Sequence, residues 1–320
     1  MSKKILLIGI LCIGSLVLQA QGTGPFGRLR VEGVQLVGES GNTVQLRGMS
    51  FGWHNFWPRF YQKQTVRWLK KDFSSNVVRA AIGVDKNLPN SYLQNPQKAK
   101  KLLDNVVRGA VRNRMYVVID WHTHDIYLPE AREFFAYVSK KYGKYDNIIY
   151  EVFNEPDYET WPEVKSYAEE IISVIRKNDP YNVILVGTPS WDQDVHLAAN
   201  DPILTDSNLM YTLHFYAATH KEWLRERADK ALEKGLPIFV SESAAMEATG
   251  DGPLDTVSWL AYIDWMEKRG ISWLTWSVSD KDETCSILYP SASSTGRWGM
   301  EDLKLSGRLV RLKLRALAGK

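Results

Sequence analysis

The sequence predicts an α/β protein with the (β/α)8 fold, a TIM barrel in a single domain with an N-terminal β-hairpin. Eight short runs of β-branched and aromatic residues alternate with segments that carry apolar residues at helical spacing, as such a barrel requires. The length of 320 residues suits one barrel, and no linker rich in Pro, Gly or Ser divides the chain. Apolar residues make up 44% of the chain, which is enough for a large buried core.

The first twenty residues have the composition of a signal peptide. A Lys-Lys pair precedes an apolar stretch at 5–17, and Ala20 is a small residue beside an expected cleavage point. The apolar stretch is too short to span a bilayer, and an uncleaved anchor is the alternative. We therefore expect a signal peptide at 1–20, a barrel domain at 21–320, and a secreted or periplasmic protein without membrane contact after cleavage.

The hairpin and the barrel elements follow in chain order. Two alternating runs, 29–37 and 43–47, flank a turn at 38–42 that contains two glycines, which is a hairpin pattern. The eight expected barrel strands are the apolar runs at 45–49, 76–82, 115–121, 148–153, 182–187, 208–215, 237–241 and 271–276. The helical patterns between and after them are 62–72, 96–114, 130–142, 162–177, 192–199, 221–234, 254–268 and 306–318.

Two of the expected strands end on a glutamate. The run at 148–153 is followed by Asn154, Glu155 and Pro156, and the proline stops the strand because it cannot donate to the sheet. The run at 237–241 is followed by Glu242. The C-terminal ends of barrel strands meet at one mouth, so we expect the two carboxylates to face each other there. A strand-end glutamate that merely contacts solvent is the alternative for each.

Polar and aromatic side chains gather at the other strand ends too. They are Arg79, His122, Trp191, His214, Tyr216 and Trp276. Two carboxylic side chains without an evident set of metal ligands indicate glycoside hydrolysis, in which one group protonates the leaving oxygen and the other stabilises or traps the oxocarbenium-like centre. Burial and the negative partner are expected to keep the acid protonated, while Arg79 and Tyr216 are expected to keep the other carboxylate ionised.

Tryptophan suggests the class of substrate, because the chain has twelve of them and flat indole rings stack on sugar rings. Those at expected strand ends or in loops are candidate sugar platforms: Trp53, Trp57, Trp121, Trp191, Trp276 and Trp298. Those inside helical patterns are expected to serve packing: Trp68, Trp223, Trp259 and Trp265. Plain core packing remains the alternative for the first set.

The chain resembles glycoside hydrolase family five, the cellulase family, and within it the bacterial endo-β-1,4-glucanase branch. The matching motifs lie at 46–50, 78–79, 120–122, 154–156, 187–191, 214–216 and 276–283, with Glu242 closing a later strand. The resemblance implies that Glu155 is the acid/base and that Glu242 is the nucleophile of a retaining enzyme. It also implies substrate-binding roles for Arg79, His122, Asn154, Trp191, His214, Tyr216, Trp276, Lys281 and Glu283.

Two places depart from the family pattern. Ser243 and Ala244 follow Glu242, where an aromatic residue and a glycine are common, so the shape of the neighbouring subsite is open. The loop after the first strand matches less clearly, which makes Trp53, His54 and Trp57 secondary candidates. Cys285 is expected to be incidental, and it is the only cysteine outside the signal-like segment, so the mature chain cannot form an internal disulfide.

Other readings of the sequence remain open at this point. A metal-dependent hydrolase is suggested by His122-Thr123-His124, although no further residues complete a metal set, and a non-catalytic sugar-binding barrel is the alternative of another class. Mannanase, mixed-linkage glucanase and xyloglucanase are alternatives within the family. We expect no cofactor, no metal and a monomer that binds β-glucan polysaccharide or oligosaccharide. The net charge of +3 includes two lysines of the signal-like segment, which argues against a nucleic-acid partner.

Overall fold

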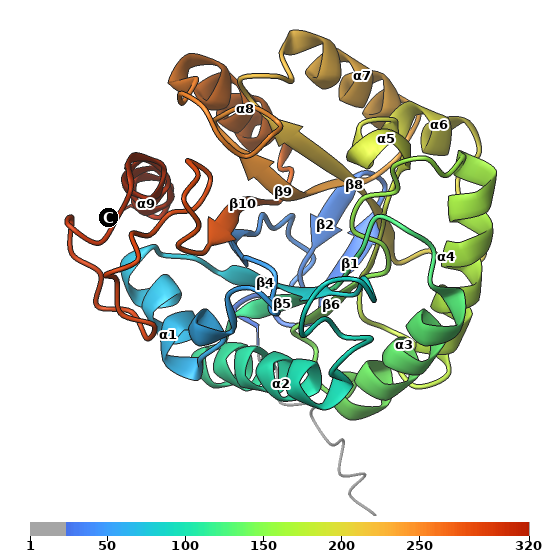
Figure 1. Cartoon of the computed structure of the whole chain (residues 1–320). Coiled ribbons are helices and arrows are strands. Elements are labelled where there is room, and N and C mark those ends of the chain that lie inside the picture. The colour runs from blue at the N-terminus through green and yellow to red at the C-terminus, as the bar shows by residue number, and fades with distance from the viewer. Residues whose placement is uncertain (1–23, 320) are drawn as a thin grey trace, which may run out of the picture.

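Eight parallel strands close into a barrel in the computed structural model, which describes residues 24–319 (Figure 1). The strand order around the barrel is β10-β3-β4-β5-β6-β7-β8-β9. The strands are β3 (Arg47–Phe51), β4 (Val77–Gly83), β5 (Tyr116–His122), β6 (Ile148–Glu151), β7 (Ile184–Val186), β8 (Leu209–Tyr216), β9 (Ile238–Ala244) and β10 (Trp273–Val278). The predicted barrel is thus confirmed, and each strand overlaps its expected run. The expected signal peptide at 1–20 lies outside the described residues.

Helices form the outer layer around the barrel (Figure 1). They are α1 (Lys63–Asp72), α2 (Pro96–Asn113), α3 (Leu128–Tyr142), α4 (Trp161–Arg176), α5 (Pro189–Asp192), α6 (Val195–Asn200), α7 (Glu222–Glu233), α8 (Thr256–Arg269) and α9 (Leu305–Leu317), with a 3-10 turn η1 (Pro58–Phe60). The pattern at 192–199 is divided between α5 and α6. Among the described residues, no helix is both long and apolar enough to span a membrane.

The N-terminal hairpin exists, but an additional turn divides its first expected strand. β1 (Arg30–Glu32) and β2 (Gln35–Val37) pair in antiparallel fashion, so the connection falls inside the run that was expected to form one strand. Gly33 has a φ of +59°, which glycine adopts without strain and which a tight hairpin connection needs. The expected turn at 38–42 is also present, because an antiparallel bridge joins Val37 to Thr43 and the backbone N–H of Gly38 donates to the carbonyl of Asn42 at 3.0 Å.

The inside of the barrel has an apolar floor and a polar layer above it. Side chains two positions apart on a strand point to the same face, so Val77 and Arg79 both point inward, as do Ile149 and Glu151. The floor is a cluster of buried residues that includes Leu46, Val77, Val118, Ile149, Leu185, Met210, Phe239 and Leu274. The polar groups at the next inward level therefore lie towards the C-terminal ends of the strands, at the mouth of the barrel.

Candidate active site

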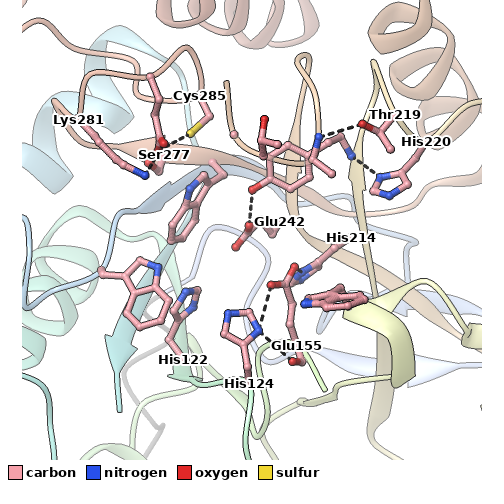
Figure 2. Close-up of a pocket in the computed structure, with 18 of the residues that line it drawn as sticks. His122, His124, Glu155, His214, Thr219, His220, Glu242, Ser277, Lys281 and Cys285 are labelled. Atoms are coloured by element: carbon pink, nitrogen blue, oxygen red, sulfur yellow. Dashed lines mark hydrogen bonds and ion pairs between the residues drawn. The ribbon is translucent and has the colours of Figure 1, made fainter. Parts of the chain in front are cut away.

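A cleft of about 1020 Å³ opens at the C-terminal mouth of the barrel (Figure 2). Its lining includes most of the residues predicted from the sequence: Trp53, Trp57, His122, Glu155, Trp191, His214, Tyr216, Glu242, Trp276, Lys281 and Glu283. Lining residues that sequence reasoning missed include Phe56, His124, Thr219, His220, Gly250 and Cys285. Arg79 and Asn154 do not line the cleft, because both are fully buried beneath it.

The two predicted glutamates point into the cleft from different strands (Figure 2). Glu155 follows β6, and Glu242 belongs to β9 near its C-terminal end. One carboxylate oxygen of each and one ring nitrogen of His214 all lie within 4.8 Å of one another. The Glu155 side chain is 13% exposed and that of Glu242 5%, so both carboxylates reach the cleft but are largely shielded from water. The expected convergence of these two strand ends is therefore present.

Glu242 is held by an arginine and a tyrosine. Nη1 of Arg79 donates to its Oε2 at 2.9 Å, and the Tyr216 hydroxyl donates to its Oε1 at 2.7 Å. Burial and the negative charge of Glu155 raise the pKa of Glu242, while Arg79 and Tyr216 lower it, and the rise prevails. The two partners expected from the sequence are present, and both oppose the rise in the pKa of Glu242.

Glu155 lies against two histidines. Nδ1 of His214 is 2.8 Å from its Oε1, and Nδ1 of His124 is 3.7 Å from its Oε2. Burial raises the pKa of Glu155, but the hydrogen bond and the positive charge of His214 outweigh burial and lower it. The sequence predicted that burial and the negative partner would favour the protonated form of Glu155; the contact with His214 acts in the opposite direction on its pKa.

Arg79 connects the site to a buried acidic layer. Its guanidinium contacts Glu151 at 2.6 Å, Asp120 at 3.0 Å and Oδ1 of Asn154 at 2.6 Å, in addition to Glu242. Glu151 and Asp120 are fully buried. Sequence reasoning assigned neither a role, although Glu151 interrupts an otherwise apolar strand, and a charged residue in a buried run was the signal that could have identified it.

His122 links this layer to an indole platform. Its Nδ1 lies 2.7 Å from Oδ2 of Asp120, and its ring stacks on Trp276 with centroids 5.2 Å apart and planes 4° from parallel. Burial lowers the pKa of His122 well below its usual range, so the ring is neutral. Trp53 meets the His122 ring edge-on at 4.3 Å. This arrangement fixes the plane of the Trp276 indole at the cleft.

The candidate sugar platforms fall into two groups. Trp53, Trp57, Trp191 and Trp276 line the cleft, as predicted. Trp121 and Trp298 do not. Trp121 is fully buried against Phe134, and Trp298 packs against Phe73 while its indole N–H donates to Ser293. Sequence position at a strand end or in a loop did not distinguish these two from the cleft-lining set, because it does not report which way a side chain points.

Two further predictions need correction. His54 is buried outside the cleft lining and accepts a hydrogen bond from the backbone N–H of Gly83 at 3.0 Å, and burial lowers its pKa to about 3. It therefore joins the loop after β3 to the C-terminal end of β4. Cys285, expected to be incidental, is buried and lines the cleft, where its thiol donates to Glu283 at 3.1 Å. Glu283 also forms an ion pair with Lys281, so these two predicted binding residues form one pair.

Two groups of side chains within the described chain have donor atoms close enough for a metal ion: Glu151, Asp192 and His214, and Glu155, His214 and Glu242. The His122-Thr123-His124 motif contributes to neither group. Glu151 and Glu242 are already paired with Arg79, and Nδ1 of His214 is hydrogen-bonded to Glu155. These contacts form a network of charge-assisted hydrogen bonds between opposite charges, which is an arrangement suited to moving protons.

The sequence profile of the cellulase family, glycosyl hydrolase family 5, matches residues 37–282. The chain belongs to this family. Endoglucanase A of Evansella cellulosilytica is 42% identical over 286 residues, which are 87% of this chain and 58% of that protein. Endoglucanase 5 of Pectobacterium carotovorum subsp. carotovorum is 39% identical over 306 residues, which are 93% of this chain and 60% of that protein. This family 5 chain thus spans about three fifths of the length of these two relatives.

Solved structures agree with the family 5 fold. A structure from Cytophaga hutchinsonii is similar with a TM-score of 0.89 and 43% identity, covering 92% of this chain and 96% of that one. The catalytic domain of Thermobifida fusca endoglucanase Cel5A is similar with a TM-score of 0.86 and 34% identity, covering 91% of this chain and 98% of that one. A variant of that domain has been solved in complex with cellotetraose.

Proposed function

We propose that this protein is a secreted endo-β-1,4-glucanase that cleaves internal bonds of β-glucan chains and retains the anomeric configuration. Glu155 is its general acid and base, and Glu242 is its nucleophile. The proposal rests on one observation, that two carboxylates from different strand ends come within 4.8 Å of each other in a tryptophan-lined cleft. Retaining glycosidases separate their two carboxyl groups by about 5–5.5 Å, whereas inverting ones leave a wider gap for water.

In the first step, the Glu155 carboxyl group gives its proton to the glycosidic oxygen as the bond between that oxygen and the anomeric carbon breaks. A carboxylate oxygen of Glu242 bonds to the anomeric carbon, which forms a glycosyl-enzyme ester and releases the leaving fragment. Arg79 and Tyr216 hold one oxygen each of the Glu242 carboxylate, so the nucleophile keeps its orientation during attack.

In the second step, the same groups act in reverse. Glu155, now a carboxylate, accepts a proton from a water molecule, and the water oxygen bonds to the anomeric carbon. The ester bond breaks and Glu242 leaves as a carboxylate. Two displacements at one carbon return the original configuration.

Aromatic and polar residues of the cleft bind the glucan. Trp276 is the platform for the sugar at the cleavage point, with His122 and His214 beside it. Asn154 lies beneath the cleft, where its amide donates to Oε2 of Glu155 at 3.4 Å. Trp191 is the platform on the leaving-group side, and the Lys281–Glu283 pair binds hydroxyls farther along the other side. The relatives are named endoglucanases, and one structural neighbour binds cellotetraose, which supports a β-1,4-glucan substrate.

Glutamine variants test the two roles. On carboxymethylcellulose, Glu155→Gln and Glu242→Gln are expected to lose about 10²–10⁴-fold or more in rate, the contribution that a positioned acid or base makes. Glu170→Gln, on the exposed face of α4, is the matched control and keeps the wild-type rate. Wild-type rates in both cleft variants contradict the assignment. If the wild type binds cellotetraose but does not hydrolyse it, the protein is the sugar-binding alternative. If it cleaves mannan or barley glucan faster than carboxymethylcellulose, the preferred substrate is that polysaccharide instead.

We also propose that the segment at 1–20 directs export, so that the mature monomer is secreted or periplasmic. The Lys-Lys start, the short apolar stretch and Ala20 support this proposal. Expression in a bacterial host with analysis of the culture medium and periplasm tests it. The expected result is a mature N-terminus that begins after Ala20. A full-length chain in the cytoplasmic fraction contradicts it.

A further inference from the structure

A buried carboxyl group that the proposed reaction does not use lies behind His214. Asp192 ends α5 and is fully buried. Its Oδ1 accepts a hydrogen bond from the backbone N–H of Thr188 at 2.5 Å. Its Oδ2 has no hydrogen-bond donor among the described residues and lies 3.2 Å from Nε2 of His214. One oxygen of this carboxyl group therefore faces the imidazole that touches Glu155.

An unusual backbone turn holds Asp192 in that position. Ser190, Trp191 and Asp192 have φ angles of 58°, 55° and 60°, the left-handed region that side chains other than glycine seldom adopt. The turn sends Trp191 into the cleft and Asp192 into the barrel wall. The backbone N–H of Trp191 donates to the carbonyl of Pro156, next to Glu155, at 2.9 Å. The turn is thus joined to the segment that carries the proposed acid.

The hydrogen bonds around His214 determine where its protons lie. Ser241 Oγ lies 2.6 Å from Oε1 of Glu151 and 2.8 Å from Nε2 of His214. A hydroxyl has one proton to donate, and the arginine-paired Glu151 accepts it. Nε2 must then carry a proton of its own in order to donate to Ser241. The other nitrogen, Nδ1, faces Glu155, so a single mobile proton is shared between Glu155 and Nδ1.

We propose that Asp192 is a positioning residue for the acid/base and that its carboxylate stabilises the state in which this proton lies on Nδ1 of His214. The inference rests on the proposed function, in which Glu155 donates and accepts protons. In one state Glu155 is a carboxylic acid and His214 is neutral; in the other Glu155 is a carboxylate and His214 is an imidazolium. In the first displacement Glu155 gives this proton to the leaving oxygen, so only the first state is competent for that step. In the second displacement the Glu155 carboxylate takes a proton from the attacking water, and Glu155 and His214 then share a proton again.

The charges that face His214 favour the imidazolium. Burial lowers the pKa of His214, but Asp192, Glu151 and Glu155 outweigh burial and raise it well above the usual range. Burial raises the pKa of Asp192 well above its usual range, although the positive charge of His214 and the hydrogen bond from Thr188 oppose that rise. Other titratable groups around the ring are Asp120 and His122 on β5, Glu242 on β9 and His220 after β8.

Asp192→Asn tests the proposal because asparagine keeps an acceptor for Thr188 and tolerates the left-handed turn, but carries no charge. The readout is kcat/KM at neutral pH on phenyl β-cellobioside, whose poor leaving group needs acid, and on dinitrophenyl β-cellobioside, whose leaving group does not. Without Asp192 the proton moves to Glu155, so the phenyl-to-dinitrophenyl ratio rises about tenfold, as a shift of one pKa unit in His214 produces. Histidine NMR reports the same shift directly, as a lower pKa of His214.

Asp194→Asn is the control for a merely structural effect on the turn. Asp194 accepts a hydrogen bond from Ser190 at 2.7 Å and pairs with Arg227, but it does not contact His214. The Asp194→Asn variant is expected to leave the phenyl-to-dinitrophenyl ratio of kcat/KM unchanged. An unchanged ratio in folded Asp192→Asn, or an equal rise in Asp194→Asn, overturns the proposal. If Asp192→Asn fails to fold, or the wild type cleaves neither substrate, histidine NMR of the wild type decides. An imidazolium at His214 at neutral pH supports the proposal, and a neutral ring overturns it.

Discussion

At the scale of single residues, Arg79 organises the site. One fully buried guanidinium contacts acceptors that come from β5, β6, the segment after β6, and β9. Its planar fork of donors suits several carboxylates at once, which a lysine does not match. The same side chain that contacts Glu242 therefore also compensates one negative charge of the acidic layer below the cleft.

Replacing Arg79 is expected to destabilise the fold as well as the site. Arg79→Met leaves Glu151 and Asp120 buried without their arginine partner, and removal of one member of a buried ion pair costs about 3–5 kcal/mol. Urea unfolding measures the loss. Arg132→Met is the control, because Arg132 pairs with Glu170 on the surface, where such pairs contribute about 0–1 kcal/mol. Equal losses in the two variants contradict the central role of Arg79.

Tyr216 is expected to influence the pH dependence of the first displacement. Its hydrogen bond lowers the pKa of Glu242, so Tyr216→Phe raises that pKa. The proposed nucleophile must be ionised, and the acidic limb of the kcat/KM profile is therefore expected to move to higher pH, by about one unit or less. Tyr211→Phe is the control, since its hydroxyl contacts the backbone of Ile203 on the far side of β8 from the cleft chemistry. If the acidic limb of the profile does not move in Tyr216→Phe, the Tyr216 hydroxyl does not lower the pKa of Glu242.

At the scale of elements, the strands were predictable because burial on both faces leaves an apolar run in the sequence. Their pairing produces the close contacts that the sequence does not state. Gly48 on β3 shows this, since a Cβ at that position would lie 1.9 Å from the carbonyl oxygen of Val77 on β4. The absence of a side chain there is what allows these two barrel strands to pair.

Gly48→Ala is accordingly expected to lower thermal stability. The added methyl group must push β3 away from β4, and overpacking of this kind costs about 1–3 kcal/mol. Thermal unfolding followed by circular dichroism measures the change as a lower Tm. A Tm equal to that of the wild type would show that the two strands separate without cost, which contradicts the tight contact at Val77.

The convergence of Glu155 and Glu242 was also predictable, because both stand at the ends of apolar strands. The residues that surround these two carboxylates were not. Asp192 lies in a turn whose left-handed backbone leaves no composition signal, and the contact of His214 with Glu155 joins residues 59 positions apart. Trp121 and Trp298 were misassigned for the opposite reason, since a position near the mouth of the barrel does not fix the direction of a side chain.

At the scale of the whole molecule, the cleft runs across the mouth of the barrel between two aromatic ends. Phe56 and Trp57 stand at one side, in contact with Trp53. Trp191 stands at the other and meets Tyr158 at 6.3 Å. A cleft bounded by rings on both sides of the two glutamates fits a polymer that extends beyond the cleavage point, and this is the geometry that internal cleavage of a glucan needs.

The Trp191 platform provides the test of this extended binding. Trp191 is 42% exposed in the cleft, whereas Trp223 is 40% exposed on α7 outside the cleft lining, so the two form a matched pair. Trp191→Ala is expected to raise KM on carboxymethylcellulose about tenfold, which corresponds to 1.4 kcal/mol of binding, with kcat nearly unchanged. Trp223→Ala is expected to change neither constant. An equal KM in the two variants would mean that the exposed indole at the mouth of the barrel does not bind the polymer.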